Sequence, residues 1–121
     1  MKNRPFQQRI GFAVAGLRAG FAREKSFRTH CLFAAAALAA LVLLRPAPLW
    51  WALIAVVIAL VMALELVNSA IETIVDLLHP ELHPEIKALK DMIAGAVLVV
   101  SLAALVVALA MVIANRAAFG L

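Results

Sequence analysis

The chain has 121 residues, of which 66% are hydrophobic, and a formal net charge of +4. Its mean hydropathy is +1.04. Soluble domains use roughly 45–50% apolar residues, so this composition excludes an ordinary soluble globular domain. The length suits one compact membrane domain over residues 1–121 and leaves no room for a separate soluble domain of usual size. The single cysteine excludes a disulfide framework or a CxxC metal site within one chain.

The N-terminal part, residues 1–28, is strongly basic, with seven Lys and Arg residues against one acid, Glu24. A nucleic-acid-binding arm has such a charge. The apolar sequence that follows favours anionic lipid headgroups instead, and we expect no nucleic-acid partner. Apolar residues recur at steps of three and four from Phe6 to Phe21. This spacing predicts an amphipathic helix lying on the membrane surface, with a solvated tail as the alternative.

Three longer apolar stretches follow and predict three transmembrane helices. The first covers about residues 29–45 and ends before Pro46 and Pro48, which mark a turn. The second covers about residues 49–78, and the third covers about 91–115, after a proline-containing loop. Each approaches or exceeds the roughly 20 residues that span a bilayer. The predicted fold class is therefore an all-α integral membrane bundle.

Lys and Arg residues are distributed unevenly along this predicted topology. They are concentrated in the N-terminal segment, and the 79–91 loop carries Lys87 and Lys90. The connection between the first two spans holds only Arg45, and the C-terminal tail only Arg116. The positive-inside rule therefore places the N-terminus and the 79–91 loop on the cytoplasmic side.

The second span ends in an acidic stripe. Glu65, Glu72 and Asp76 are separated by 7 and then 4 residues, which returns them to one side of a helix, and Asn68 flanks them. A charged side chain near hydrocarbon costs a few kcal/mol, so it is a candidate for function. The alternative is a structural polar seam between spans, and Asn68 could equally be an interhelical hydrogen-bonding residue.

The acidic stripe and the residues near it suggest a chemistry. Carboxylate and amide oxygens are ligands that suit Mg²⁺, which often takes one or two carboxylates and completes its shell with substrate phosphates. Lys90 can neutralise phosphate charge. This set fits phosphoryl transfer. The sequence has no GxxxxGK[ST] loop and no protein-kinase signature, so any ATP site must be of another kind.

These residues carry a resemblance to a known family. Glu65-Leu66-Val67-Asn68-Ser69-Ala70-Ile71-Glu72, with Asp76 and then Lys90-Asp91-Met92, closely resembles the prokaryotic diacylglycerol kinases. Gly16-Leu17-Arg18-Ala19 and Glu24 with Phe27-Arg28 match the N-terminal part of that family, and the resemblance covers about residues 11–115. It implies a homotrimer in the bacterial cytoplasmic (inner) membrane. Such an enzyme uses ATP and Mg²⁺ to phosphorylate a membrane lipid hydroxyl, in sites shared between neighbouring subunits.

The resemblance also implies a role for each matching position. Glu65 corresponds to the catalytic base, Glu24 and Glu72 to the metal-binding carboxylates, and Asn68 to a supporting amide. The nucleotide-binding positions are Glu24, Glu72, Asp76, Glu81, Leu82, His83, Lys90 and Asp91. The lipid-binding positions are Arg18, Phe27, Arg28, Glu65 and Ala94.

Two lipid acceptors stay open. Diacylglycerol is the first choice because the ExxNSAIE core and the loop length fit that enzyme without gaps. The best-known diacylglycerol kinases carry a Glu shortly after the Phe-Arg pair, whereas this chain continues with Thr29-His30. That difference, together with Ala94-Gly95-Ala96, resembles the undecaprenol kinase branch.

Two other classes of membrane protein must be weighed. A small proton-coupled transporter also uses an intramembrane carboxylate. Such proteins place it near the midplane and need no cytosolic Lys-Asp pair. Here the acids are expected at one end, beside Lys90 and Asp91. A non-catalytic membrane scaffold leaves the acidic stripe unexplained.

Overall fold

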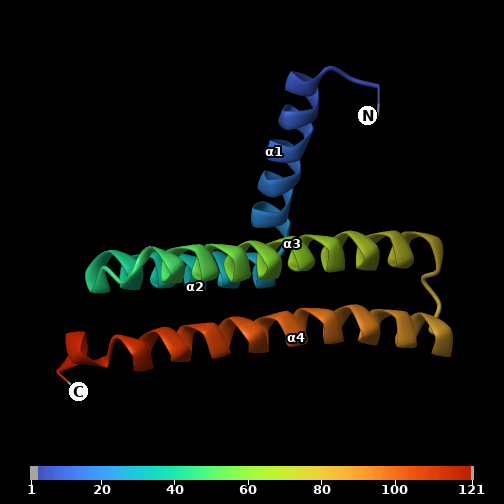
Figure 1. Cartoon of the computed structure of the whole chain (residues 1–121). Helices are drawn as coiled ribbons and strands as arrows, with labels where there is room; N and C mark the ends of the chain where they lie inside the picture. Colours follow the sequence, from blue (N-terminus) through green and yellow to red (C-terminus); the bar gives the residue numbers. More distant parts are fainter. Residues whose placement is uncertain (1–2, 121) are drawn as a thin grey trace.

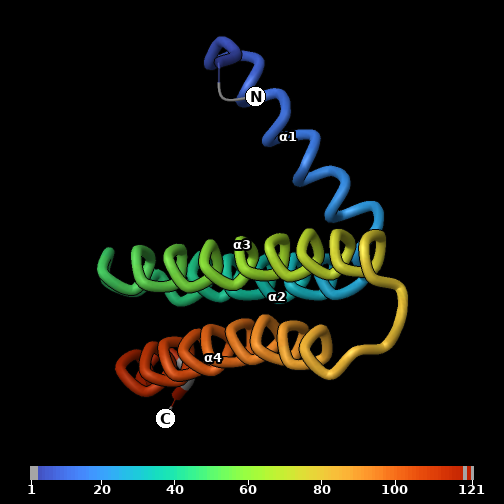
Figure 2. Tube along the Cα trace, turned by 90° about the vertical axis from the view of Figure 1, so that its right-hand side faces the viewer, coloured from blue at the N-terminus to red at the C-terminus, as the bar shows by residue number. Residues whose placement is uncertain are grey.

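A computed structural model describes residues 3–120, and none of these residues forms a strand. The helices are α1 (Phe6–Arg23), α2 (Lys25–Leu44), α3 (Pro48–Leu78), α4 (Pro84–Ala114) and a short 3-10 helix, η1 (Arg116–Phe119). Helices α2, α3 and α4 run alongside one another, and consecutive helices are antiparallel (Figure 1). Helix α1 projects away from them at a steep angle, which is also visible in Figure 2. The predicted all-helical fold class is confirmed.

Local sequence signals explain where α3 and α4 begin. Each starts with a proline at its first position, Pro48 and Pro84, where the missing N–H costs nothing. Before Pro48, α2 ends at Arg45, which takes a left-handed conformation with φ 48°. Its N–H donates to the Leu41 carbonyl at 2.9 Å. Before Pro84, the His83 ring accepts a hydrogen bond from the Glu85 N–H at 3.1 Å and caps α4.

The three bundle helices are long and apolar enough to cross a membrane, as predicted. Helix α2 has 20 residues, whereas α3 and α4 have 31 each. At 1.5 Å per residue, a 31-residue helix is about 46 Å long, more than the roughly 30 Å hydrocarbon core. The charged residues Glu72, Asp76, Lys87 and Lys90 all lie toward the end where α3 is connected to α4. Charged residues can therefore lie on these helices outside the hydrocarbon.

The helices extend beyond the predicted transmembrane spans at two places. Helix α4 begins at Pro84, not near residue 91, and α2 begins at Lys25, not near residue 29. The predicted 79–91 loop shrinks accordingly to residues 79–83. The difference has a physical cause. The predicted spans end where the apolar sequence ends, whereas a helix is defined by its backbone hydrogen bonds. Backbone hydrogen bonds continue through polar residues, as where the Lys87 N–H donates to the His83 carbonyl at 3.0 Å.

The hydrophobic core lies at the end of the bundle opposite the acids. It centres on the buried residues Leu41, Ile54 and Met111, with Ala37, Leu44, Trp50, Ile58 and Val107 packed against it. Most other large apolar side chains are exposed, including those of α1 such as Phe6 at 72%. Contiguous apolar surface of this kind is typical of contact with lipid or with other subunits. The location of α1 on a membrane surface stays a prediction.

The junction between α1 and α2 is held by close packing. Gly20 is buried, and a Cβ there would lie 2.5 Å from the Leu66 Cδ2 of α3. Phe27 is 4% exposed, and its ring packs against Gly20. Arg28 donates from Nη1 to the carbonyls of Phe21 at 2.8 Å and Ala22 at 3.2 Å, where α1 ends. The junction therefore fixes Glu24, which stands between the two helices, beside α3.

Candidate functional site

The acidic stripe continues the apolar buried face of α3. Ile54, Val61 and Glu65 are all buried and follow one another at steps of 7 and 4 residues, which keeps them on one side of the helix. Glu72 and Asp76 extend this side toward the end of α3. Glu65 is 5% exposed, and no other charged residue is buried in the part of the chain that the structure describes. A carboxylate thus stands where the apolar face gives way to the polar one.

Two side chains accompany Glu65 in this buried region. His30 of α2 places its Nε2 3.0 Å from Glu65 Oε1. One turn further along α3, Asn68 has a buried Oδ1 with no hydrogen-bond partner among the described residues. Leaving such an atom unsatisfied costs about 1–3 kcal/mol. The Asn68 Oδ1 is therefore available to a ligand one helical turn from the Glu65 carboxylate.

Glu24 lies beside a neighbouring side of α3, next to the acidic stripe. It is half-buried and lines a groove of about 330 Å³ between α1 and α3. Leu66, Ser69 and Thr73 form the α3 wall of this groove. Ser69 is adjacent to Asn68 on the helix, so the groove borders the acidic stripe. Within residues 3–120, no three His, Cys, Asp or Glu side chains gather closely enough to hold a metal by themselves.

Lys90 connects α4 to the outer end of the acidic stripe. Its Nζ donates to Asp76 Oδ1 at 2.6 Å, and the two side chains are 34% and 64% exposed. Lys87 and Asp91 form a second pair at 2.6 Å, one turn apart on α4. Exposed ion pairs add little stability. The Lys90 ammonium is instead held in place while it stays accessible to an anionic ligand.

The other predicted site residues lie apart from these groups in a single chain. Glu81 and Leu82 are exposed in the connection between α3 and α4, and His83 caps α4. Arg18 on α1 and Ala94 on α4 are exposed too. Phe27 and Arg28 belong to the α1–α2 junction described above. The roles of all these residues toward nucleotide or lipid stay predictions.

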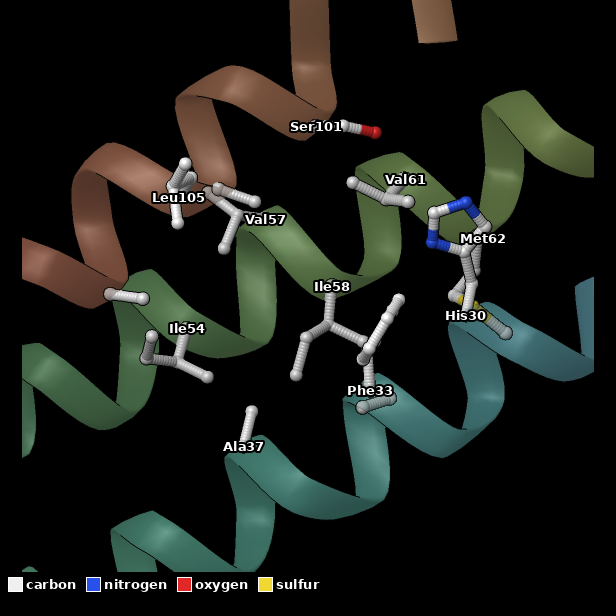
Figure 3. Close-up of a pocket in the computed structure, with 13 residues that line it drawn as sticks. His30, Phe33, Ala37, Ile54, Val57, Ile58, Val61, Met62, Ser101 and Leu105 are labelled. Carbon is white, nitrogen blue, oxygen red and sulfur yellow. The ribbon is translucent and has the colours of Figure 1, made fainter. Parts of the chain in front are cut away.

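The contact of His30 with Glu65 was not predicted. The two residues are 35 positions apart, and no sequence pattern gives the register of α2 against α3. His30 also lines one end of an apolar groove of about 440 Å³, which runs between α2, α3 and α4. Figure 3 shows this groove, with Phe33, Val61 and Met62 near the imidazole.

Comparison with known proteins assigns the chain to a family. The family model for prokaryotic diacylglycerol kinase matches residues 11–112, a range that contains every residue predicted for the site. The curated proteins and the solved structures give no match. Because the family model covers most of the sequence, the chain belongs to the prokaryotic diacylglycerol kinase family.

Proposed function

We propose that this protein is a lipid kinase, which transfers the γ-phosphoryl group of ATP to a hydroxyl of a membrane lipid. Diacylglycerol is the preferred acceptor and phosphatidic acid the product. The observation that carries this proposal is the buried Glu65 carboxylate at the polar end of an apolar helix face, in a chain of this family. Undecaprenol is the alternative acceptor, because Thr29-His30 and Ala94-Gly95-Ala96 resemble the undecaprenol kinase branch.

Glu65 acts in this proposal as the general base. Its neighbours on the same helix face are the apolar Val61 and Ile54, so a lipid can approach through an apolar environment and bring its hydroxyl to the carboxylate. The carboxylate accepts the hydroxyl proton as the hydroxyl oxygen attacks the γ-phosphorus of ATP, the bond from that phosphorus to the β–γ bridging oxygen breaks, and ADP leaves. Asn68, whose buried Oδ1 has no hydrogen-bond partner among residues 3–120, supports the acceptor or a ligand at that point.

Glu24 and Glu72 are proposed to hold Mg²⁺. A single chain gathers no three-ligand cluster among residues 3–120, which argues against an all-protein cage. Two carboxylates suit Mg²⁺, because this ion usually completes its octahedral shell with water and substrate phosphates. When bound, the ion neutralises phosphate charge. The residues thus fit a metal that arrives with ATP.

The nucleotide is proposed to lie at the outer ends of α3 and α4. Lys90 there is accessible and held against Asp76, and Asp91 and Glu72 are nearby in sequence on the same two helices. The surplus length of α3 and α4 takes this region beyond the hydrocarbon. In the proposed orientation it faces the cytoplasm, where ATP is available.

A lipid panel tests the function directly. Purified protein is incubated with labelled ATP, Mg²⁺ and either diacylglycerol or undecaprenol, and labelled lipid is extracted and counted. The proposal expects Mg²⁺-dependent labelling, with diacylglycerol labelled at least as fast as undecaprenol. Apolar pockets usually discriminate between similar substrates by no more than about a hundredfold in rate. A larger preference for undecaprenol would therefore reverse the order of acceptors. No labelling of either lipid would refute the kinase and leave a transporter as the next candidate.

A further inference from the structure

The structure assigns to His30 the task of positioning Glu65: we propose that the imidazole, through the close contact of its Nε2 with the Glu65 carboxylate, holds that carboxylate toward the acceptor lipid. This inference rests on the proposed function for its catalytic meaning. The contact itself rests on geometry alone. His30 Nε2 and Glu65 Oε1 are 3.0 Å apart, the distance of a close polar contact.

Burial makes this contact consequential. The Glu65 side chain is 6% exposed and that of His30 is 21% exposed, so little water reaches the carboxylate. Among residues 3–120, His30 is the cation-forming side chain within 4 Å of Glu65, since the remaining ion pairs involve Lys87 and Lys90. A buried carboxylate needs a polar or charged partner, and His30 lies in contact with it.

The surroundings of His30 also fix the direction of its ring. Phe33, one turn along α2, meets the imidazole edge-on, with ring centroids 6.3 Å apart and an interplanar angle of 68°. Val61 and Met62 of α3 line the same groove (Figure 3). An imidazole packed between two helices keeps its Nε2 beside Glu65, whereas a free surface histidine would not. His30 touches no reacting atom in this arrangement, so it is a positioning residue.

Three variants separate positioning from packing. His30→Leu keeps an apolar body of similar size and removes the polar contact, and His30→Gln retains a polar group on a side chain of similar reach. His79→Leu is the matched control, because His79 is exposed at the end of α3 and contacts neither Glu65 nor the groove. We expect kcat of His30→Leu to fall roughly 10-fold to 100-fold, as for loss of a polar partner of a charged group, with KM for MgATP within about twofold.

The expected pattern has two further parts. His30→Gln should recover a clear share of the lost kcat. In a Glu65→Gln background, His30→Leu should cause less than about a threefold additional loss, because the group that it positions is already gone. Equal kcat in His30→Leu and His79→Leu, or full additivity with Glu65→Gln, overturns the proposal. The proposal is also overturned if the lower kcat of His30→Leu is explained by a lower thermal midpoint of unfolding and if His30→Gln does not restore kcat.

A spectroscopic measurement keeps this inference separate from the kinase assignment. In protein with ¹⁵N-labelled histidine, Glu65→Gln should shift the ring nitrogens of His30 and leave those of His79 unchanged, with the His30→Gln spectrum identifying the signal. Unshifted His30 signals overturn the contact whatever the activity. If wild-type protein labels no lipid while the shift is present, the kinase proposal fails and the His30–Glu65 contact stands.

Discussion

Replacing Glu65 with Gln keeps the shape of the side chain and removes its basicity. Turnover should fall by roughly 10²–10⁴, the usual contribution of a general base. ATP binding, measured by a fluorescent analogue, should survive because Glu65 lies at the apolar end of the stripe. Glu85→Gln is the matched control, since Glu85 is exposed in the first turn of α4 and outside the proposed site. Near-normal turnover of Glu65→Gln would remove Glu65 from the role of base.

Glu24 and Glu72 should respond to metal rather than to lipid. Substituting either with Gln removes one hard ligand, so the Mg²⁺ concentration for half-maximal activity should rise or activity should be lost. The measurement is a Mg²⁺ titration of lipid phosphorylation at fixed ATP, with Glu85→Gln again as control. If both variants titrate like the wild type, the ion is held by other residues.

The positions of the site residues were predictable from sequence only where helix periodicity determines them. The spacing of Glu65, Glu72 and Asp76 needs nothing but a continuous helix, and α3 provides one. The pairing of Lys90 with Asp76 and of His30 with Glu65 depends on how neighbouring helices are registered. Hydrophobicity sets which face is buried but not the register along the axis, so these partners required the structure.

At the scale of elements, the structure makes the polar start of α4 helical where a loop was predicted. Residues 84–91 carry Lys87, Lys90 and Asp91, and their hydropathy resembles that of a loop. Proline at a helix start, a His83 cap and an i, i+4 Lys87–Asp91 pair all favour a helix there. The number of spans followed from hydropathy because apolar runs are long. Helix ends did not, because the helices continue through polar residues beyond the apolar runs.

Ala88→Pro tests this helical start. Ala88 is exposed in the second turn of α4, and proline there removes a backbone hydrogen bond and clashes with the Pro84 carbonyl. We expect a destabilisation of about 3 kcal/mol, against about 1 kcal/mol for the control Ala88→Gly. Thermal unfolding in detergent, followed by circular dichroism, gives the comparison. Equal midpoints for the two variants would show that residues 84–91 are not helical.

At the scale of the whole molecule, one chain looks incomplete for the proposed reaction. Large apolar side chains on the bundle are exposed, such as Leu98 at 59% and Val99 at 67%. Glu24 faces a groove between α1 and α3, while Glu65 faces α2. Small residues Ala94-Gly95-Ala96 allow another helix to approach closely. These features support the prediction of a homotrimer with sites formed between subunits.

Mixing two inactive variants tests whether subunits share a site. One carries Glu65→Gln and the other Glu24→Gln, and each alone should be inactive or nearly so. If a site takes its base from one subunit and Glu24 from the next, random assortment in an equal mixture leaves about one quarter of the sites intact. Subunit exchange in detergent should then restore activity toward that fraction. The same mixture kept below the exchange temperature is the control.

Two separate measurements distinguish the formation of a trimer from the sharing of a site between its subunits. Cross-linking or native mass should show three chains per particle, and dilution to monomers should abolish activity if the site needs a neighbour. A trimer with no recovery on mixing would place Glu24 and Glu65 of each site in one chain. A monomer with full activity would show that α1–α4 of a single chain suffice. The exposed apolar faces would then be left to lipid alone.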